Sequence, residues 1–331
     1  MRKRKAEHLR ICLEQPVEVG STGLERYRFV HQALPEVDLE KIDTSIKFLG
    51  KKLAAPILIS SMTGGTPEAS KINKNLARAA QKMGVAMAVG SQRVAIEKPR
   101  LASTFQIRGV APDILLFANL GVVQFNYGYG LKECQRAVEM IKADALALHL
   151  NPLQEVIQPE GNTNFADLLS KIARVVKELS VPVIAKEVGC GISQEVAKKL
   201  YQVGVKIVDT AGWGGTNWAK VEGVRAKNSL GETFAQWGIS TAESIIQCHR
   251  VKGLEIIGSG GIRNGLETAK AIALGADLVG QALPFLALAA QTTRAVEEKL
   301  RLLIRELKIT MFCLGVRNVG ELKSVQLIKV L

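Results

Sequence analysis

A glycine-rich turn near the end of the chain has the composition of a phosphate-binding site. An apolar run ends in residues 258–265, which contain four glycines, and residues 266–274 then have the pattern of a helix. Glycines let backbone N–H groups approach an anion closely, and the N-terminus of the next helix adds the positive end of its dipole. A second apolar run follows at 278–283. The pair favours phosphate binding over a tight turn that holds no ligand.

Other apolar runs end in polar side chains that suit binding or catalysis. They are Ser61, Thr63, Ser91, Arg93, Asn119, His149, Asn151, Gln154, Glu155, Lys186, Asp209 and Thr216. Lys186 is unusual because it stands inside an apolar run, where a lysine is rarely buried without a partner. Either Asp209 pairs with it or it faces a cofactor, and the two interpretations are compatible. His149 and Asn151 are two residues apart on a predicted strand and so point to the same side, which favours a shared ligand.

The elements that position these side chains alternate along the chain. Eight apolar runs are predicted strands, at 56–62, 85–91, 114–121, 145–151, 182–189, 205–210, 255–258 and 278–283. Nearly continuous apolar strands alternating with amphipathic helices indicate a parallel sheet buried on both faces, and eight of them close into a (β/α)8 TIM barrel. An open doubly wound sheet is less favoured, because no GxGxxG motif follows the first strand. Active sites of such barrels lie at the carboxyl ends of the strands, so we expect the polar side chains on one rim.

The chain outside these strands divides into an N-terminal extension and a C-terminal tail. Residues 1–50 are the extension, with a short helix expected over 5–13 and one strand near 45–48. Residues 51–331 are assigned to the barrel and a helical tail that includes a charged outer helix over 291–308.

The composition narrows the class of protein. The 331 residues carry a formal net charge of +13, which favours anionic partners. Aromatic residues make up only 5% of the chain, so a nucleic-acid-binding surface of interleaved basic and aromatic residues is not expected. The five cysteines are far apart and form no CxxC pair, which indicates free thiols in a reducing cytosol and a cytoplasmic protein. No apolar run is long enough to span a membrane.

The polar rim and the glycine-rich turn together suit a flat mononucleotide such as FMN. Flavin needs hydrogen-bonding groups along its pyrimidine edge, and a positive group there stabilises the anionic reduced form. The residues expected around the ring and ribityl chain are Ser61, Met62, Thr63, Ser91, Asn119, Lys186 and Thr216. Those expected at the phosphate are Gly260, Gly261, Gln281 and Ala282, and Gly258 is also expected to bind the cofactor.

The motifs, taken in order, resemble those of the type 2, flavin-dependent isopentenyl-diphosphate isomerases. The resemblance runs from residue 4 to about residue 285 and includes Arg4-Lys5, Ser61-Met62-Thr63-Gly64-Gly65, Ser91-Gln92-Arg93, Asn119, residues 149–155, residues 161–165, Lys186-Glu187-Val188-Gly189, residues 212–216 and residues 258–265. Residues 149–155, with the sequence HLNPLQE, are the motif that best distinguishes this family from other barrel families. The turn at 258–265 is shared by several barrel families.

The resemblance implies an enzyme that interconverts isopentenyl and dimethylallyl diphosphate. It implies a homo-oligomer, a tetramer or octamer, that holds FMN, requires Mg²⁺ and uses NADPH to reduce the flavin without net redox change. It implies that the N-terminal extension contributes to binding of a small-molecule diphosphate, through Arg4 and Lys5. The other implied substrate-binding residues are Ser91, Arg93, His149, Asn151 and Gln154. The implied catalytic residues are Gln154, His149 and Lys186, and the implied metal ligand is Glu155.

Three other functions fit parts of the sequence less well. An FMN-dependent 2-hydroxy-acid oxidase uses the same barrel but needs a histidine base beside an arginine, and residues 213–218 contain neither. A purine-nucleotide dehydrogenase needs a nucleophilic cysteine on a rim loop, where Cys190 is the only candidate and lacks that family's flanking residues. A basic nucleic-acid-binding protein is the third alternative. It would bind no flavin, so the purified protein would lack the yellow colour that bound FMN gives.

Overall fold

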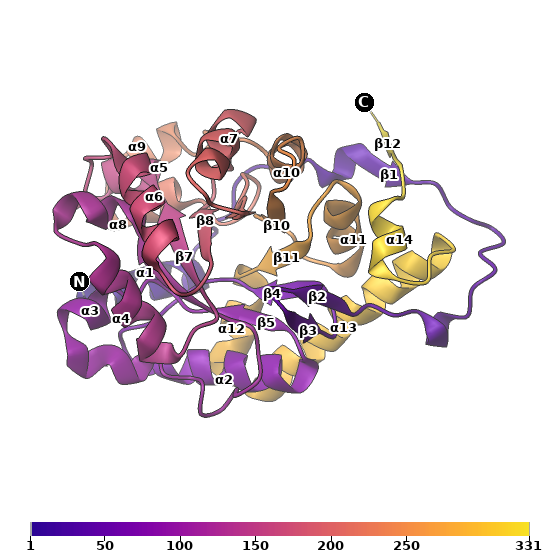
Figure 1. Ribbon diagram of the computed structural model, residues 1–331, viewed down its shortest axis with the longest axis horizontal. Coiled ribbons are helices and arrows are strands. Elements are labelled where there is room, and N and C mark those ends of the chain that lie inside the picture. Colours follow the sequence, from indigo (N-terminus) through magenta and orange to yellow (C-terminus); the bar gives the residue numbers. More distant parts are fainter. Residues whose placement is uncertain (1, 331) are drawn as a thin grey trace.

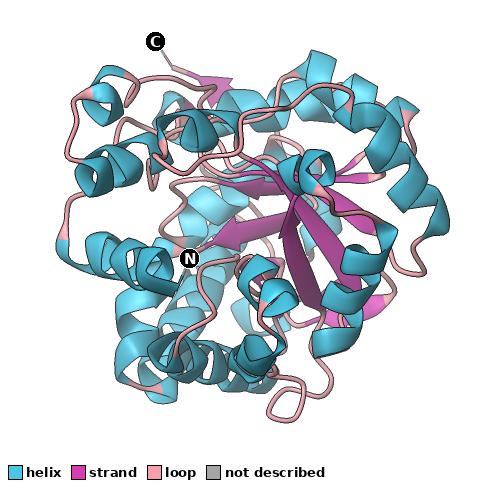
Figure 2. Cartoon of the chain, turned by 90° about the vertical axis from the view of Figure 1, so that its left-hand side faces the viewer, coloured by secondary structure: helices cyan, strands magenta, loops and turns pink. Residues whose placement is uncertain are grey.

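Eight short parallel strands close into a barrel that helices surround (Figure 2). The computed structural model describes residues 2–330. In chain order the strands are β4 (Ile57–Ile59), β5 (Ala86–Ala88), β6 (Leu116–Gly121), β7 (Ala145–Leu150), β8 (Val183–Glu187), β9 (Ile207–Asp209), β10 (Glu255–Ser259) and β11 (Leu278–Gln281). Each pairs with the next, and β11 pairs with β4, which closes the ring. The predicted (β/α)8 barrel is confirmed, and the open sheet is excluded.

The end of the barrel at the amino termini of its strands is closed by a hairpin, which lies where the N-terminal extension meets the barrel. Strands β2 (Ile46–Phe48) and β3 (Lys51–Leu53) pair antiparallel. Phe48 and Leu53 belong to the same buried cluster as Phe117 and Ile184 inside the barrel. The strand expected near residues 45–48 is therefore confirmed, with a partner strand that was not predicted. Because apolar side chains fill this end, only the carboxyl ends of the strands are left to form a ligand site.

Helices cover the outside of the barrel, and those over residues 265–273 and 293–313 lie close to the segments predicted at 266–274 and 291–308, whereas the helix over residues 283–291 was not predicted. The covering helices are α2 (Pro67–Met83), α4 (Leu131–Ile141), α6 (Leu168–Glu178), α7 (Gln194–Gln202), α10 (Thr241–His249), α11 (Gly265–Ala273), α12 (Leu283–Gln291) and α13 (Thr293–Cys313). Local sequence sets their ends, as α2 illustrates. The Thr66 side chain accepts from the Ala69 N–H, Pro67 occupies the first turn, and Gly84 ends the helix with a φ of 63°.

Several elements beside the barrel were not predicted. Strand β1 (Tyr27–Phe29) pairs antiparallel with β12 (Leu327–Lys329), so segments from opposite ends of the chain form a ribbon (Figure 1). Short helices α3 (Arg93–Glu97) and α5 (Pro152–Ile157) follow strands β5 and β7.

The long connection after β9 contains two further helices, α8 (Trp218–Ala226) and α9 (Leu230–Thr233), where a loop was expected. The helix expected over residues 5–13 is confirmed and extended as α1 (Arg2–Glu14), which packs against α8. Among residues 2–330, no helix has the length and apolarity needed to cross a membrane.

Candidate active site

One cavity opens at the carboxyl ends of the barrel strands, and it gathers nearly all of the predicted site residues. The predicted residues that line it are Arg4, Lys5, Ser61, Met62, Thr63, Ser91, Arg93, Asn119, His149, Asn151, Gln154, Glu155, Lys186, Thr216, Gly260, Gly261, Gln281 and Ala282. The side chains His8, Cys12, Gln124, Trp218 and Arg263 also line it and were not predicted. The rim inferred from the sequence is thus a single concave site.

Two predicted residues, Gly258 and Asp209, do not line this cavity. A Cβ atom at Gly258 would lie 2.8 Å from the Ile245 side chain and 2.9 Å from that of Ala276. This glycine therefore lets β10 pack closely against its covering elements. The expected role of Gly258 in cofactor binding therefore gains no support from the cavity lining, since its Cβ position lies on the face of β10 that packs against Ile245 and Ala276.

The glycine-rich turn packs tightly against the loop that follows β9. A Cβ atom at Gly260 would lie 2.2 Å from the Gly212 carbonyl oxygen, and one at Gly215 would lie 2.4 Å from the Gly261 nitrogen. Gly260 and Gly261 have φ values of 109° and 71°, which favour glycine. The two loops therefore bring bare backbone to the wall of the cavity, as a phosphate site requires.

The N-terminus of α11 is occupied by protein groups, contrary to the simplest expectation from the sequence. The Glu306 carboxylate accepts from the Gly265 N–H at 2.6 Å, and the Asn264 side chain accepts from the Glu267 N–H at 2.8 Å. An anion at this end of the cavity would therefore bind the backbone that precedes the helix, at Gly260 and Gly261.

Buried polar atoms that lack a protein partner support a ligand in this part of the cavity. Gln281 Oε1 and Ser60 Oγ line the cavity without a hydrogen-bond partner among residues 2–330. Burial of a polar atom is unfavourable unless it is hydrogen-bonded, so a bound polar group is expected beside them. An FMN phosphate and ribityl chain would satisfy this requirement, and the residues here fit that cofactor.

Lys186 satisfies both interpretations of its place in an apolar strand. Its Nζ lies 3.2 Å from Asp209 Oδ2 and donates to the Glu187 carbonyl at 2.9 Å, while the side chain also lines the cavity. Asp209 is 2% exposed and accepts a hydrogen bond from Ser259 Oγ. A fixed positive charge therefore faces the cavity from the barrel wall.

The conformation of His149 is set by its neighbour on strand β6. Asn119 Oδ1 lies 2.8 Å from His149 Nδ1, and Asn119 Nδ2 donates to Ser61 Oγ at 2.9 Å. Burial, reinforced by Lys5 and other nearby cations, lowers the pKa of His149 to about 3. The imidazole is therefore neutral at physiological pH.

Helix α1 and the segment after β5 bring cations to another wall of the cavity, away from the glycine-rich turn. Arg4 and Lys5 line the cavity, and Lys5 Nζ lies 3.5 Å from the Ser91 carbonyl oxygen. Burial and the adjacent Arg4 lower the pKa of Lys5 to about 8. Arg93 donates to Asn162 Oδ1 at 2.9 Å and to Glu97 at 2.8 Å. These cations suit an anionic ligand, whereas Asn151 Oδ1, which is buried without a partner among the described residues, needs a hydrogen-bond donor.

Glu155 is held at the edge of this wall by backbone and side-chain donors. It accepts from the Asn162 N–H at 2.6 Å and from Asn151 Nδ2 at 3.1 Å, and it is 7% exposed. Within residues 2–330, no three His, Cys, Asp or Glu side chains cluster as a ready-made metal site. A single carboxylate fits Mg²⁺, which commonly binds one or two carboxylates together with phosphate oxygens.

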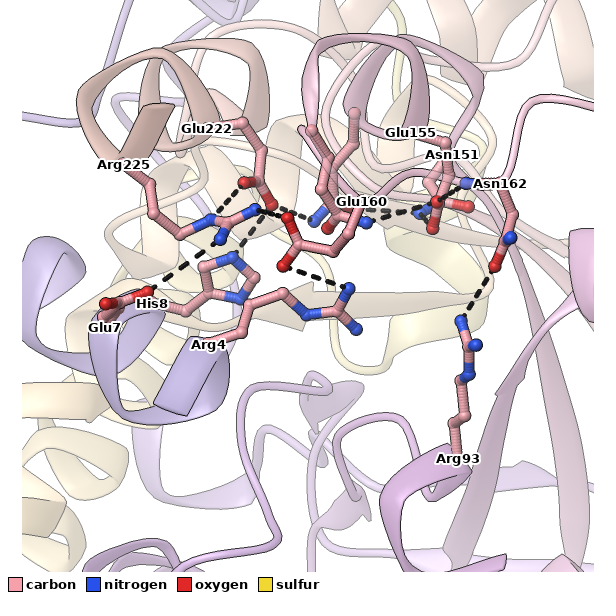
Figure 3. Close-up of polar contacts among 12 residues, drawn as sticks. Arg4, Glu7, His8, Arg93, Asn151, Glu155, Glu160, Asn162, Glu222 and Arg225 are labelled. Carbon is pink, nitrogen blue, oxygen red and sulfur yellow. Dashed lines mark hydrogen bonds and ion pairs between the residues drawn. The ribbon is translucent and has the colours of Figure 1, made fainter. Parts of the chain in front are cut away.

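A buried ionic network behind the cavity was missed from the sequence (Figure 3). Glu222 on α8 lies 2.8 Å from His8 Nε2, accepts from Gln154 Nε2 at 3.2 Å and accepts from Arg225 at 2.7 Å. Burial would raise the pKa of Glu222, but the contacts with His8, Arg225 and Gln154 lower it overall. Burial lowers the pKa of His8. The only local signal was the Glu–Arg spacing of three residues in a segment expected to be a loop.

The comparisons with known proteins agree with this geometry. The profile of the FMN-dependent dehydrogenase family matches residues 14–104 and 135–329. The isopentenyl-diphosphate delta-isomerase of Nostoc sp. is 56% identical over 97% of this chain and 93% of its own length. The enzyme of the same name from Rickettsia bellii is 51% identical over 98% of this chain and 97% of its own length.

Solved structures share the fold at low identity. A lactate oxidase from Pediococcus acidilactici superposes with a TM-score of 0.72 at 19% identity, over 93% of this chain and 84% of that one. A mandelate oxidase mutant with an FMN adduct superposes with a TM-score of 0.67 at 20% identity, over 93% and 90%. The barrel is common to all, whereas the full-length identity is to the isomerases. The chain therefore belongs to the isopentenyl-diphosphate delta-isomerase family, built on the barrel of the FMN-dependent dehydrogenases.

Proposed function

We propose that the protein interconverts isopentenyl and dimethylallyl diphosphate on reduced FMN. The observation that carries the proposal is the presence of two different anion-binding walls in one cavity. The glycine-rich backbone lies after β10 and β11, and Arg93 and Asn151 follow β5 and β7. In the closed ring β11 stands opposite β7, so Asn151 lies across the cavity from the glycine-rich backbone, while Arg93, which follows β5, lies a quarter turn around the ring from β11. One wall suits a flavin phosphate, and the other suits a diphosphate.

Residues of the chain hold the cofactor in the proposed complex. Met62, Thr63, Ser91 and Asn119 border the flavin, and Lys186 places its charge near the pyrimidine edge, where it favours the anionic reduced form. Reduced FMN, when bound, supplies an acid/base group beside the alkene, which ordinary side chains protonate poorly at neutral pH. NADPH is the proposed reductant.

The opposite wall binds the diphosphate in this proposal. Arg4, Lys5 and Arg93 supply positive charge, and Asn151 and His149 supply hydrogen-bonding groups. Glu155 would hold Mg²⁺ beside the diphosphate, and the cation would offset the repulsion that a bare carboxylate exerts on the anion.

Gln154 orients the reacting carbons in the proposed complex. Its Nε2 is already bonded to Glu222, which fixes the amide at the cavity wall. His8 lines the cavity from α1, and its contact with Glu222 joins Gln154 to that helix through one carboxylate. These groups can hold or exchange a proton close to the substrate.

The proposal also includes a cytoplasmic location and assembly as a homo-oligomer. The five unpaired cysteines, Cys12, Cys134, Cys190, Cys248 and Cys313, support a reducing compartment. Size-exclusion chromatography with light scattering gives the oligomeric state directly.

A spectrum and a product assay test the proposed function. The purified protein should show an oxidised flavin spectrum that bleaches with NADPH, and the reduced enzyme with Mg²⁺ should convert isopentenyl diphosphate into dimethylallyl diphosphate. Oxidation of lactate or mandelate with no isomerisation would instead favour the oxidase alternative. A colourless protein that cannot be reconstituted with FMN would contradict both.

A further inference from the structure

Arg225 on α8 bridges three carboxylates that come from three separate segments. Its Nε lies 2.7 Å from Glu222, one Nη lies 2.7 Å from Glu160, and the other lies 3.9 Å from Glu7 on α1 (Figure 3). The side chain is only 11% exposed and does not line the cavity. Arg225 therefore cannot touch a ligand there. It does contact Glu160 and Glu222, which lie next to the cavity residues Arg4 and Gln154.

Glu160 is shared between Arg225 and Arg4. One carboxylate oxygen lies 2.7 Å from Arg225, while the other lies 3.9 Å from Arg4 Nη1. The shorter contact holds Glu160 on the α8 side. The Gln158 amide lies between Arg4 and Glu222, 3.0 Å from each. Arg4 thus lines the cavity with its charge only weakly neutralised by the protein.

Glu222 depends on the same guanidinium. Its side chain is fully buried, and besides Arg225 it contacts Gln154 and His8. A buried carboxylate that loses its ionic partner is strongly destabilised and moves or takes up a proton. Arg225 therefore fixes the position and charge of the group that holds Gln154.

We propose that Arg225 is a positioning residue with two separable tasks, which rests on the function proposed above. It draws Glu160 away from Arg4, so that Arg4 is available to the diphosphate. It also holds Glu222 against Gln154 and His8, so that Gln154 is fixed beside the reacting carbons. The first task governs substrate affinity, and the second governs turnover.

Variants of Arg225 and Glu160 separate the two tasks. In the FMN-loaded enzyme, Arg225→Gln should weaken inorganic diphosphate binding about tenfold, because Glu160 then pairs with Arg4, and it should also lower kcat. Adding Glu160→Gln to that variant should restore diphosphate affinity and KM but leave kcat low. This non-additive pattern is the expected signature, measured by calorimetry and by steady-state kinetics.

Three controls exclude general charge or folding effects. Arg225→Gln combined with Glu232→Gln restores the net charge at a side chain that is 70% exposed, and it should leave diphosphate binding weak. Arg174→Gln breaks a surface pair with Glu178 and should change neither quantity. Glu160→Gln alone keeps Glu222 paired, so it tests the first task even if Arg225→Gln fails to fold, and it should bind diphosphate at least as tightly as the wild type.

Weaker diphosphate binding by Glu160→Gln alone would overturn the proposal, since Glu160 would then support Arg4. Wild-type affinity and kcat in Arg225→Gln would overturn it as well. A wild-type protein that binds diphosphate but lacks isomerase activity would contradict the proposed function instead, because the affinity measurements do not depend on turnover.

Discussion

The Lys186 ammonium group lies 3.2 Å from the Asp209 carboxylate, and the two residues are register partners on adjacent barrel strands. The pair places an ammonium group beside its counter-ion within the barrel wall. Since Asp209 does not line the cavity, the positive end of the pair is the one presented to a ligand.

Replacement of Lys186 by alanine should weaken FMN binding and make the potential of the bound flavin more negative, because the charge that favours the anionic reduced form is lost. The variant also leaves Asp209 buried and unpaired, so we expect a loss of about 3 kcal/mol of stability. Redox titration and thermal unfolding measure the two effects. Unchanged flavin content and potential would show that Lys186 does not contact the cofactor.

Glu155→Gln should raise the Mg²⁺ concentration needed for half activity by at least about tenfold while FMN stays bound. The Asn162 N–H would retain the amide oxygen as its acceptor, which turns the amide NH₂ group toward the metal. Gln154→Ala should lower kcat with a normal Mg²⁺ titration. Wild-type metal dependence in Glu155→Gln would remove this carboxylate from the metal site.

Gly161→Ala should imitate the effect of Glu155→Gln on the metal without changing any charge. A Cβ atom at Gly161 would lie 1.7 Å from the Glu155 carbonyl oxygen, so the loop must move and carry the Asn162 N–H with it. Overpacking of this kind costs about 1–3 kcal/mol of stability. Thermal unfolding and Mg²⁺ titration of the same sample check both parts, and normal behaviour in both would show that the loop tolerates a side chain.

Deletion of residues 1–6 should raise KM for the diphosphate about a hundredfold, since two charge-assisted hydrogen bonds of about 1.5 kcal/mol each are lost. The barrel should stay folded, because Leu9 and Ile11 remain to pack the rest of α1. Circular dichroism and FMN content serve as controls. Wild-type kinetics in the truncated enzyme would make Arg4 and Lys5 mere surface charges.

Diphosphate affinity should fall about tenfold between about pH 7 and pH 9 if Lys5 binds only when protonated, because its pKa of about 8 lies in that range. The charged form prevails below that pKa and is lost as the pH rises through it. Lys5→Met should bind weakly at both values and lose this component of the pH dependence. Parallel pH profiles of the two proteins, measured by calorimetry, would contradict the assignment.

Local patterns were sufficient to predict the barrel and most residues of the cavity. Apolar runs gave the strands, and the polar residue that ends each run gave the rim, including Lys186 and His149. The network around Glu222 could not be predicted in this way, because its burial depends on α1, which lies more than two hundred residues earlier in the chain. The place of Gly258 away from the cavity could not be predicted either, because composition alone does not tell which face of a strand a glycine occupies.

The ribbon of β1 and β12 has a consequence for folding kinetics. Tyr27 pairs with Lys329, a sequence separation of 329 − 27 = 302 residues. Contacts of such separation carry a large loop-closure entropy until the intervening chain is ordered, so this ribbon forms after the barrel. Substitutions in it should therefore accelerate unfolding and leave the folding rate nearly unchanged. The segment that joins α1 to the barrel would then open early in unfolding and close late in folding.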